Sequence, residues 1–364
     1  MKILIYIGHP AQFLFFKNFI KQEKQKGNEV IVLIKSKDVL EDLIKKEDIE
    51  YVNIVKTERK NSKLSIAFGL IKRIVKVLYH WRKNRPDILV GTDPSLAIVG
   101  YLTKTPCITT LEDDAAVIPK LVKTTYPYTN TILVPECCDV GPKWNNKKIG
   151  YAGYMKLAYL HQKYFKPNPA ILQNLKSDRY VLVRLSKLSA HHDTDIKGVS
   201  NQLIDTLIKY TTDRSMDLYI SSERELPSSL EKYRLTTPVS DIHHVLYYSS
   251  LLISDSQSMS VEASMLGTPS VRFSDFSGRI SVLEELENKY HLTFGFKSTE
   301  QQEMLDKVLE ILSMPEAKEE FRMRCEKMLD EKIDVTSFLM WFVEEYPNSR
   351  DIMLKDPSYQ YRFK

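Results

Sequence analysis

The sequence predicts an α/β protein made of two doubly wound domains that face a cleft, with a helical C-terminus. Short apolar segments alternate with segments of helical spacing, which is typical of parallel strands covered on both faces. The alternation stops once, over the tyrosine-rich residues 147–175, and then begins again. A chain of 364 residues is long enough for two such domains. We therefore expect domains at 1–160 and 161–335 and a C-terminal tail at 336–364.

The first domain is predicted from its apolar segments in chain order. Residues 2–8 form a short apolar run, and residues 11–28 place apolar side chains at helical spacing before Gly27 ends the pattern. Further strands are expected at 29–35, 50–55, 86–92, 107–112 and 131–135, and further helices at 37–48 and 62–83.

The second domain repeats the pattern. Strands are expected at 179–185, 216–222, 251–254 and 269–273, and helices at 197–211, 240–250 and between the last two strands. After Ser281 the chain is expected to be mostly helical to about Glu345. In open α/β sheets ligands bind at the carboxyl ends of the strands, so the loops that follow these strands are where a site is expected.

Composition argues against several classes of protein. The 52 Lys and Arg against 47 Asp and Glu give a net charge of +5, which does not indicate a nucleic-acid partner but suits anionic ligands. Four cysteines without Cys-x-x-Cys spacing argue against a zinc site and for reduced thiols, so we expect a cytoplasmic protein without a metal. No apolar stretch reaches the length of a membrane span, and the N-terminal apolar run is too short for a signal peptide.

A serine-rich stretch at 251–273 holds the first candidate site. It predicts a strand, a turn and a helix that Ser256 or Ser258 can cap. The exposed amides at the start of such a helix bind anions, and phosphate above all. Glu262, about one turn further along, is placed to accept from ribose hydroxyls. We predict that these residues, with Asp255, bind a phosphate and a ribose, and the alternative is that the serines only cap the helix.

A second candidate group follows the first strand of the second domain. It consists of Arg184, Lys187, His191 and His192. Cations and hydrogen-bond donors at the carboxyl end of a strand suit a pyrophosphate, and a histidine there can also transfer protons. The alternative is a solvated polar loop. Asp193 and Asp195 form an Asp-x-Asp that binds a divalent metal in one class of sugar transferases, but so short a match carries little weight.

Candidate acid–base groups follow strands of the first domain. His9 lies at the first strand-to-helix turn, and Glu112 and Asp113 end the strand at 107–112. Close carboxylates raise one another's pKa and produce a general base. The alternatives are a helix-capping histidine and a solvated acidic loop. In the second domain, His243 in the helix at 240–250 is a weaker candidate for a phosphate contact.

Residues 59–85 contain nine Lys and Arg and no acid. With Phe68, Leu70 and Trp81, a helix here could lie on an anionic membrane as a peripheral contact. The alternative, to which we give more weight, is an ordinary crossover helix before the strand at 86–92.

Four stretches together resemble the bacterial and archaeal family known as domain of unknown function 354 (DUF354). They are residues 8–38, 184–198, 219–235 and 254–273, and the resemblance spans nearly the whole chain. It implies a glycosyltransferase with a GT-B-like fold of two Rossmann-like domains, similar in turn to the non-hydrolysing UDP-GlcNAc 2-epimerases.

Those epimerases carry a Thr-Asp-Ser-Gly-Gly-x-x-Glu-Glu-Ala stretch, which this chain matches at Asp255, Ser256, Glu262 and Ala263. The resemblance implies that Ser256 contacts phosphate and Glu262 contacts ribose. Gln257 and Ser258 replace the two glycines, which leaves the closeness of the backbone to the phosphate open. The epimerase motifs with the acid and base groups are matched only loosely, by His191-His192 and residues 110–115. This departure favours glycosyl transfer over epimerisation.

We therefore expect a glycosyltransferase that uses a nucleotide-activated, UDP-linked sugar to build a surface polysaccharide or glycolipid. Its partners would be the nucleotide-sugar donor and a saccharide or lipid-linked acceptor, with no cofactor, and it would work in the cytoplasm or on the inner face of the cell membrane. His9, Glu112 or Asp113 would be the acceptor base. Two alternatives stay open: a UDP-sugar 2-epimerase, and a non-catalytic nucleotide-sugar-binding protein of an envelope assembly complex.

Overall fold

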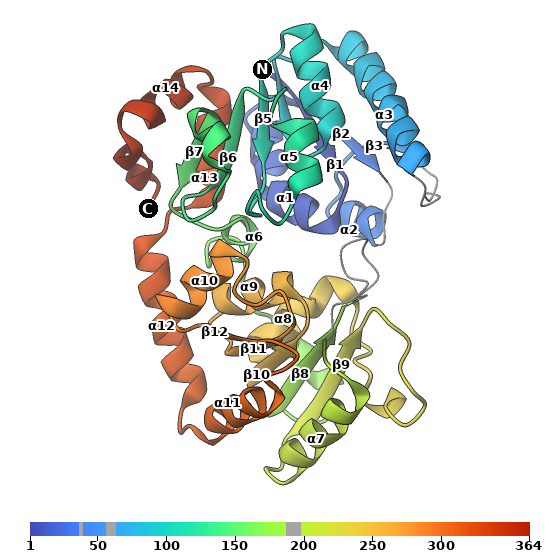
Figure 1. The fold of residues 1–364 in the computed structure, drawn as a ribbon, viewed down its shortest axis with the longest axis vertical. Helices are drawn as coiled ribbons and strands as arrows, with labels where there is room; N and C mark the ends of the chain where they lie inside the picture. Colours follow the sequence, from blue (N-terminus) through green and yellow to red (C-terminus); the bar gives the residue numbers. More distant parts are fainter. Residues whose placement is uncertain (36–38, 56–62, 187–197) are drawn as a thin grey trace. The chain divides into compact units, whose positions relative to one another are not determined.

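The computed structural model describes residues 1–35, 39–55, 63–186 and 198–364 (Figure 1). The chain divides into two compact units, and each is described by itself. The first unit holds Met1–Tyr164 together with Lys332–Lys364, and the second holds Phe165–Glu331.

The first unit is built on a sheet of seven parallel strands in the order β3-β2-β1-β4-β5-β6-β7. The order reverses between β1 and β4, which is the switch point at which doubly wound sheets bind ligands. The strands are β1 Lys2–Ile7, β2 Glu29–Lys35, β3 Val52–Val55, β4 Ile88–Gly91, β5 Cys107–Thr110, β6 Thr131–Pro135 and β7 Lys148–Tyr151.

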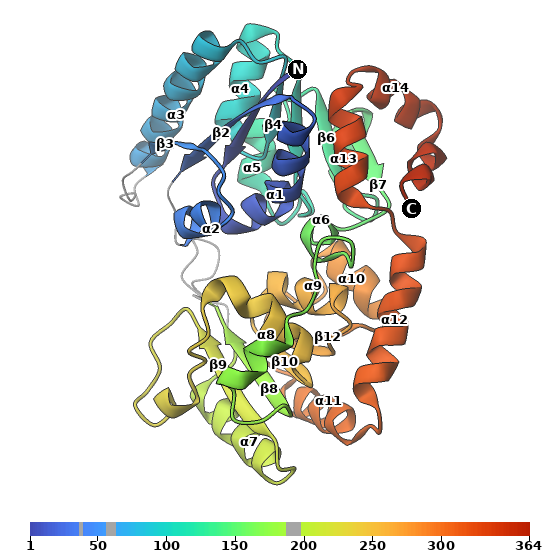
Figure 2. The same cartoon turned by 180° about the vertical axis from the view of Figure 1, so that it is seen from behind.

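Helices cover both faces of this sheet (Figures 1 and 2). They are α1 Pro10–Gln25, α2 Leu40–Lys46, α3 Lys63–Asn84, α4 Pro94–Thr103, α5 Pro119–Thr125, α6 Leu157–Leu160, α13 Val335–Glu344 and α14 Asn348–Lys355. Short 3-10 helices occupy Pro142–Lys147 (η1) and Pro357–Phe363 (η5). Because both faces are covered, the apolar residues of β1 are fully buried, as expected for central parallel strands.

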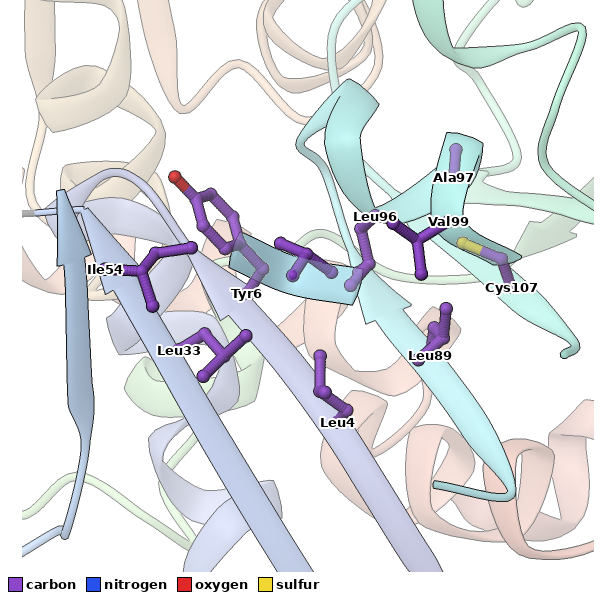
Figure 3. Packing of buried hydrophobic residues seen from close by; sticks show 10 residues of the cluster. Leu4, Tyr6, Leu33, Ile54, Leu89, Leu96, Ala97, Val99 and Cys107 are labelled. Atoms are coloured by element: carbon purple, nitrogen blue, oxygen red, sulfur yellow. The ribbon is translucent and has the colours of Figure 1, made fainter. Parts of the chain in front are cut away.

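The core on one face joins β1 and its neighbours to α3 and α4 (Figure 3). Leu4 and Tyr6 of β1 point to this face because side chains alternate along a strand. Helix α4 comes close to the sheet at Gly100, where an added Cβ would lie 2.9 Å from the Cβ of Cys107. This close approach explains a glycine inside a helix.

The second unit has a sheet of five parallel strands in the order β12-β11-β10-β8-β9. The strands are β8 Tyr180–Leu185, β9 Asp217–Ser222, β10 Leu251–Ser254, β11 Ser270–Phe273 and β12 Thr293–Phe296. The α-helices are α7 Asn201–Thr212, α8 Ile242–Tyr248, α9 Gln257–Met265, α10 Ser281–Asn288, α11 Gln301–Ser313 and α12 Ala317–Glu331. Three 3-10 helices occupy Pro169–Asn174 (η2), Glu231–Tyr233 (η3) and Val239–Asp241 (η4).

The predicted α/β class, the two parallel sheets and the helical C-terminus are confirmed. Two strands escaped prediction. Residues 147–175 were expected to bridge two domains, but they begin with β7, which pairs with β6. Strand β12 lies in the region after Ser281 that was expected to be mostly helical. In both four-residue strands a glycine lies between the apolar residues, so neither shows the apolar run that marks a buried strand.

The last residues of the chain pack into the first unit, whereas the sequence suggested a separate tail at 336–364. Gln360 is fully buried there: its Oε1 accepts from the backbone N–H of Ala152 at 2.6 Å, and its Nε2 donates to Glu136 at 2.8 Å. Val335 packs so closely on Gly153 that a Cβ added to Gly153 would lie 2.6 Å from Cγ2 of Val335. Within the described ranges, no helix is long and apolar enough to cross a membrane.

Candidate functional site

The start of α9 is capped as the serine-rich stretch predicts. Ser256 is the N-cap residue, in extended backbone conformation, and its Oγ accepts from the N–H of Met259 at 3.4 Å. Its own N–H donates to Ser254 Oγ at 2.8 Å. Ser258 is exposed in the first turn. The first turn of a helix presents amide groups without intrahelical acceptors, so this end of α9 is suited to an anion.

The remaining serines of the stretch serve the helix itself. Ser260 Oγ donates to the carbonyl of Ser256 at 3.2 Å, and Ser264 Oγ donates to that of Ser260 at 3.0 Å. Both are fully buried, and bonding to the preceding turn satisfies them. Gly267 ends the stretch with φ of +66°, the left-handed conformation that glycine commonly adopts after the end of a helix.

Glu262 and His243, both predicted as site residues, lie together. Oε1 of Glu262 is 3.3 Å from Nε2 of His243, and the two side chains are only 10% and 13% exposed. The ring of Phe165 contacts the ring of His243 edge-on, with 6.4 Å between the ring centroids, and stacks on the ring of His244 with 4.8 Å between the centroids. Helix α8 therefore positions the carboxylate of Glu262 through His243.

Asp255 joins the ends of three neighbouring strands. Its side chain is fully buried, and Oδ1 accepts from the N–H and the Oγ of Ser186, at 2.6 and 2.8 Å. Oδ2 accepts from Nη2 of Arg224 at 2.6 Å. Gly198 packs against the same carboxylate, where an added Cβ would lie 2.8 Å from Oδ2. Asp255 thus holds this edge of the sheet together, and its predicted contact with a nucleotide sugar stays a prediction.

Three arginines at this edge each meet a carboxylate. Arg184, the predicted one, also donates from Nη1 to Ser221 Oγ at 2.8 Å. Arg224 and Arg272 were not predicted, although an arginine two residues after a strand and another inside an apolar strand were visible signals. The pairs are Arg184 with Glu223, Arg224 with Asp255, and Arg272 with Glu287.

Arg272 is the most deeply buried of the three. It is 1% exposed, and its Nη1 donates to Oε1 of Gln257, the first residue of α9, at 3.4 Å. In the part of the chain that the structure describes, Nε of Arg272 and Nε2 of Gln257 have no hydrogen-bond partner. Arg272, paired with Glu287, therefore supports the start of α9 through its hydrogen bond to Gln257.

The predicted residues Lys187, His191 and His192, and the Asp-x-Asp at 193–195, lie outside the described residues. The described chain stops at Ser186, just after β8, and resumes at Gly198, before α7. Both of these residues contact Asp255, as described above. Across the described ranges, no group of three or more His, Cys, Asp or Glu side chains could hold a metal.

In the first unit, the acidic turn after β5 holds the candidate acid–base groups Glu112 and Asp113. Glu112 forms an ion pair with the buried Lys156, and its Oε2 accepts from the N–H of Met155 at 3.0 Å. Asp114 Oδ1 accepts from the N–H of Asp139 at 2.7 Å. Lys156 was not predicted, because it lies 44 positions after Glu112 and the sequence gives no signal for a contact at that distance.

Asp113 lies between these two carboxylates. Burial raises its pKa above the ordinary range for aspartate, and the charges of Glu112 and Asp114 raise it further, while Lys156 lowers it. The sequence predicted mutual repulsion as the cause, and the larger cause is burial. Asp113 keeps some exposure to solvent, so it combines access with a raised pKa, which is what a general base needs.

His9 caps α1, and its Nδ1 accepts from the N–H of Ala11 at 3.2 Å. The ring is exposed. Its strand, β1, is two strands from β5 in the sheet, so roughly 10 Å of strand spacing separates His9 from the acidic turn. His9 and Asp113 thus share one sheet edge without sharing a strand, and the catalytic role of His9 stays a prediction.

Solved structures of the same fold cover nearly the whole chain. The Neisseria meningitidis UDP-GlcNAc 2-epimerase bound to UDP-GlcNAc aligns with a TM-score of 0.68 at 14% identity, over 91% of this chain and 100% of that chain. The S. aureus MnaA–UDP co-structure aligns with a TM-score of 0.65 at 14% identity, over 96% of this chain and 97% of that chain. The spinosyn rhamnosyltransferase SpnG complexed with spinosyn aglycone aligns with a TM-score of 0.63 at 12% identity, over 94% of this chain and 99% of that chain. At such identities the likeness shows the fold, which is GT-B-like, as the sequence predicted.

No curated protein matches the chain in sequence. The model of a family described as protein of unknown function (DUF354) matches residues 1–337, which is most of the chain and includes every candidate site residue discussed above. The chain therefore belongs to the DUF354 family.

Proposed function

We propose that this protein is a glycosyltransferase that moves a sugar from a UDP-linked donor to a hydroxyl group of a saccharide or lipid-linked acceptor. In this proposal the second unit binds the donor and the first unit supplies the acceptor base. The product would be a surface polysaccharide or glycolipid made in the cytoplasm, on the inner face of the membrane.

The observation that carries the proposal is the state of Asp113. The two neighbouring carboxylates already have partners in the fold, since Glu112 pairs with Lys156 and Asp114 accepts from a backbone amide. Asp113 is partly accessible and has a raised pKa. An acceptor hydroxyl must lose its proton as it attacks the sugar, and a carboxylate of raised pKa takes that proton more readily than an ordinary aspartate.

The second unit offers groups for each part of a nucleoside diphosphate. The amides at the start of α9, with Ser256 and Ser258, would hold the diphosphate, and Glu262 would accept from the ribose hydroxyls. Hydrogen-bond donors aimed at the leaving diphosphate stabilise the charge that develops on it during transfer. The names of two solved structures of this fold include UDP or UDP-GlcNAc, which supports a UDP-linked donor.

The acidic turn favours transfer over epimerisation. Inversion of a sugar carbon by proton exchange needs one group to remove a proton from one face and another to return it to the opposite face. Transfer needs a single base for the acceptor. With Glu112 neutralised by Lys156, Asp113 is the carboxyl of this turn that suits proton transfer, and one such group is enough for a transferase.

Product analysis with a panel of nucleotide sugars, with and without a membrane lipid extract, tests the proposal. We expect a glycosylated product and free nucleoside diphosphate only when an acceptor is present. Asp113→Asn should lower the rate about 10²- to 10⁴-fold while UDP affinity is kept. Asp351→Asn, on the exposed surface of α14 in the same unit, is the matched control and should keep the wild-type rate.

Two results would overturn the proposal. If the protein converts one UDP-sugar into its epimer without an acceptor, it is a 2-epimerase. If it binds UDP-sugars but turns over none of them, with or without the lipid extract, it is a binding protein.

A further inference from the structure

Helix α3 has an inner apolar face that the fold explains. Val77 is fully buried in the core of the first unit, and Ile74, Leu78 and Trp81 pack against the same cluster. Nε1 of Trp81 also donates to Thr105 Oγ1, just after α4, at 2.8 Å. These contacts account for the apolar residues on one side of the helix.

The opposite side of α3 carries a second apolar stripe, which the core does not use. It consists of Phe68, Ile71, Val75 and Tyr79, whose side chains are 72%, 57%, 60% and 62% exposed. Spacings of three, four and four residues place them within an arc of about 80°, and the stripe is about 16 Å long. The sequence suggested Trp81 as a surface anchor, but the structure turns it to the core, and the outward stripe takes its place.

Basic side chains border this stripe. Lys72, Arg82 and Lys83 are exposed on the same helix, and no acid occurs anywhere between residues 59 and 86. Two other basic residues of the helix serve the fold: Lys76 donates to the carbonyl of Ile54 at 2.5 Å, and Arg73 pairs with Asp93. Among the residues that the structure describes, no carboxylate pairs with the three exposed cations.

We propose that the outer face of α3, defined by Phe68, Ile71, Val75 and Tyr79 with their basic border, docks on the surface of an anionic phospholipid bilayer. A helix with exposed apolar side chains beside Lys and Arg lies in the plane of the interface, with its apolar stripe among the headgroups and its cations on the phosphates. A second copy of the chain fits this face less well, because the same uncompensated cations would meet across the contact. The inference goes beyond glycosyl transfer and does not depend on it.

Co-sedimentation of the whole protein with vesicles tests the inference without any sugar substrate. We expect binding to vesicles of phosphatidylcholine with phosphatidylglycerol, and much weaker binding to phosphatidylcholine alone. The variant Ile71→Ser/Val75→Ser should lose at least about tenfold in affinity, because two exposed apolar side chains no longer enter the interface. The variant Lys72→Gln/Lys83→Gln should lose roughly thirtyfold on the anionic vesicles, and added salt should have a similar effect.

The matched control is Val239→Ser, which changes another exposed valine (57%) in the second unit and should leave vesicle binding unchanged. Thermal melting checks that the α3 variants fold, as expected for substitutions at exposed positions. Failure of the wild-type protein to bind anionic vesicles would overturn the inference, as would unchanged binding by both α3 variants. A dimer seen by light scattering that Ile71→Ser/Val75→Ser converts to a monomer would also overturn it, because the face would then join two copies of the chain.

Discussion

Removal of the Glu262 carboxylate should weaken the binding of UDP by about ten- to hundredfold. A hydrogen bond between a charged group and a ligand hydroxyl contributes about 1.5–3 kcal/mol, which corresponds to that range of affinity. The carboxylate is mostly excluded from water, and its Oε1 is held 3.3 Å from Nε2 of His243. The group is therefore already oriented before a ribose arrives, so little of the interaction energy is spent on ordering it.

Titration calorimetry of UDP into a set of variants provides the assay. Glu262→Ala should show the full loss of affinity, and His243→Ala a smaller one, because the carboxylate remains but is less well positioned. In the double variant the loss should equal that of Glu262→Ala alone, since His243 acts through Glu262. Glu326→Ala, an exposed glutamate of α12, is the control. Unchanged UDP affinity in Glu262→Ala would refute the placement of the nucleotide at α9, and additive losses would mean that His243 binds UDP independently.

Three further predictions follow from single side chains. Because the pKa of Asp113 is raised, its carboxyl should take up a proton at a pH above the ordinary aspartate pKa of about 3.9, and kcat/KM should fall there on acidification. A flat acid limb in the pH–rate profile would contradict this. Asp255→Asn should lower the free energy of unfolding by about 3 kcal/mol in urea titrations, because an amide cannot accept from all three donors that face it. A change below about 1 kcal/mol would show that this edge of the sheet does not need the charge. Gln360→Ala should lower the free energy of unfolding by about 1–2 kcal/mol and speed hydrogen exchange in residues 357–363, because the bonds to Ala152 and Glu136 are lost; unchanged exchange would mean that the ring contacts of Tyr359 and Phe363 with Trp341 alone hold this end.

The longer strands could be predicted because their signal is local. A strand covered on both faces by helices must be apolar at nearly every position, and β1, β2 and β8 show this directly in the sequence. In β7 and β12 a glycine interrupts the apolar residues, whereas in β4 three apolar residues precede the glycine, so the identity of β7 and β12 depends on the neighbour with which they pair. That neighbour, β6 or β11, is fixed only once the sheet has formed.

The candidate site could be predicted in part for the same reason. The Ser256 cap and the position of Glu262 one turn later follow from spacing within one helix. The partners of these residues do not. His243 reaches Glu262 from another helix, and Lys156 meets Glu112 across 44 residues, so both contacts are products of tertiary packing. The raised pKa of Asp113 depends mainly on burial, which spacing along the chain does not reveal.

The pairing of the arginines changes how a diphosphate can be held in the second unit. The sequence suggested Arg184 as a cation for a pyrophosphate, and in the structure Arg184, Arg224 and Arg272 each have a carboxylate partner. Each of these pairs is formally neutral, so together they add no net positive charge for a ligand that carries two or more negative ones. In the proposed donor site, the attraction would then come from the amides of the first turn of α9, which Arg272 supports through Gln257, or from cations in the segment 187–197. Amide groups at a helix start are fixed and close to the ligand, so a site that depends on them should be less sensitive to salt than a site built from exposed lysines.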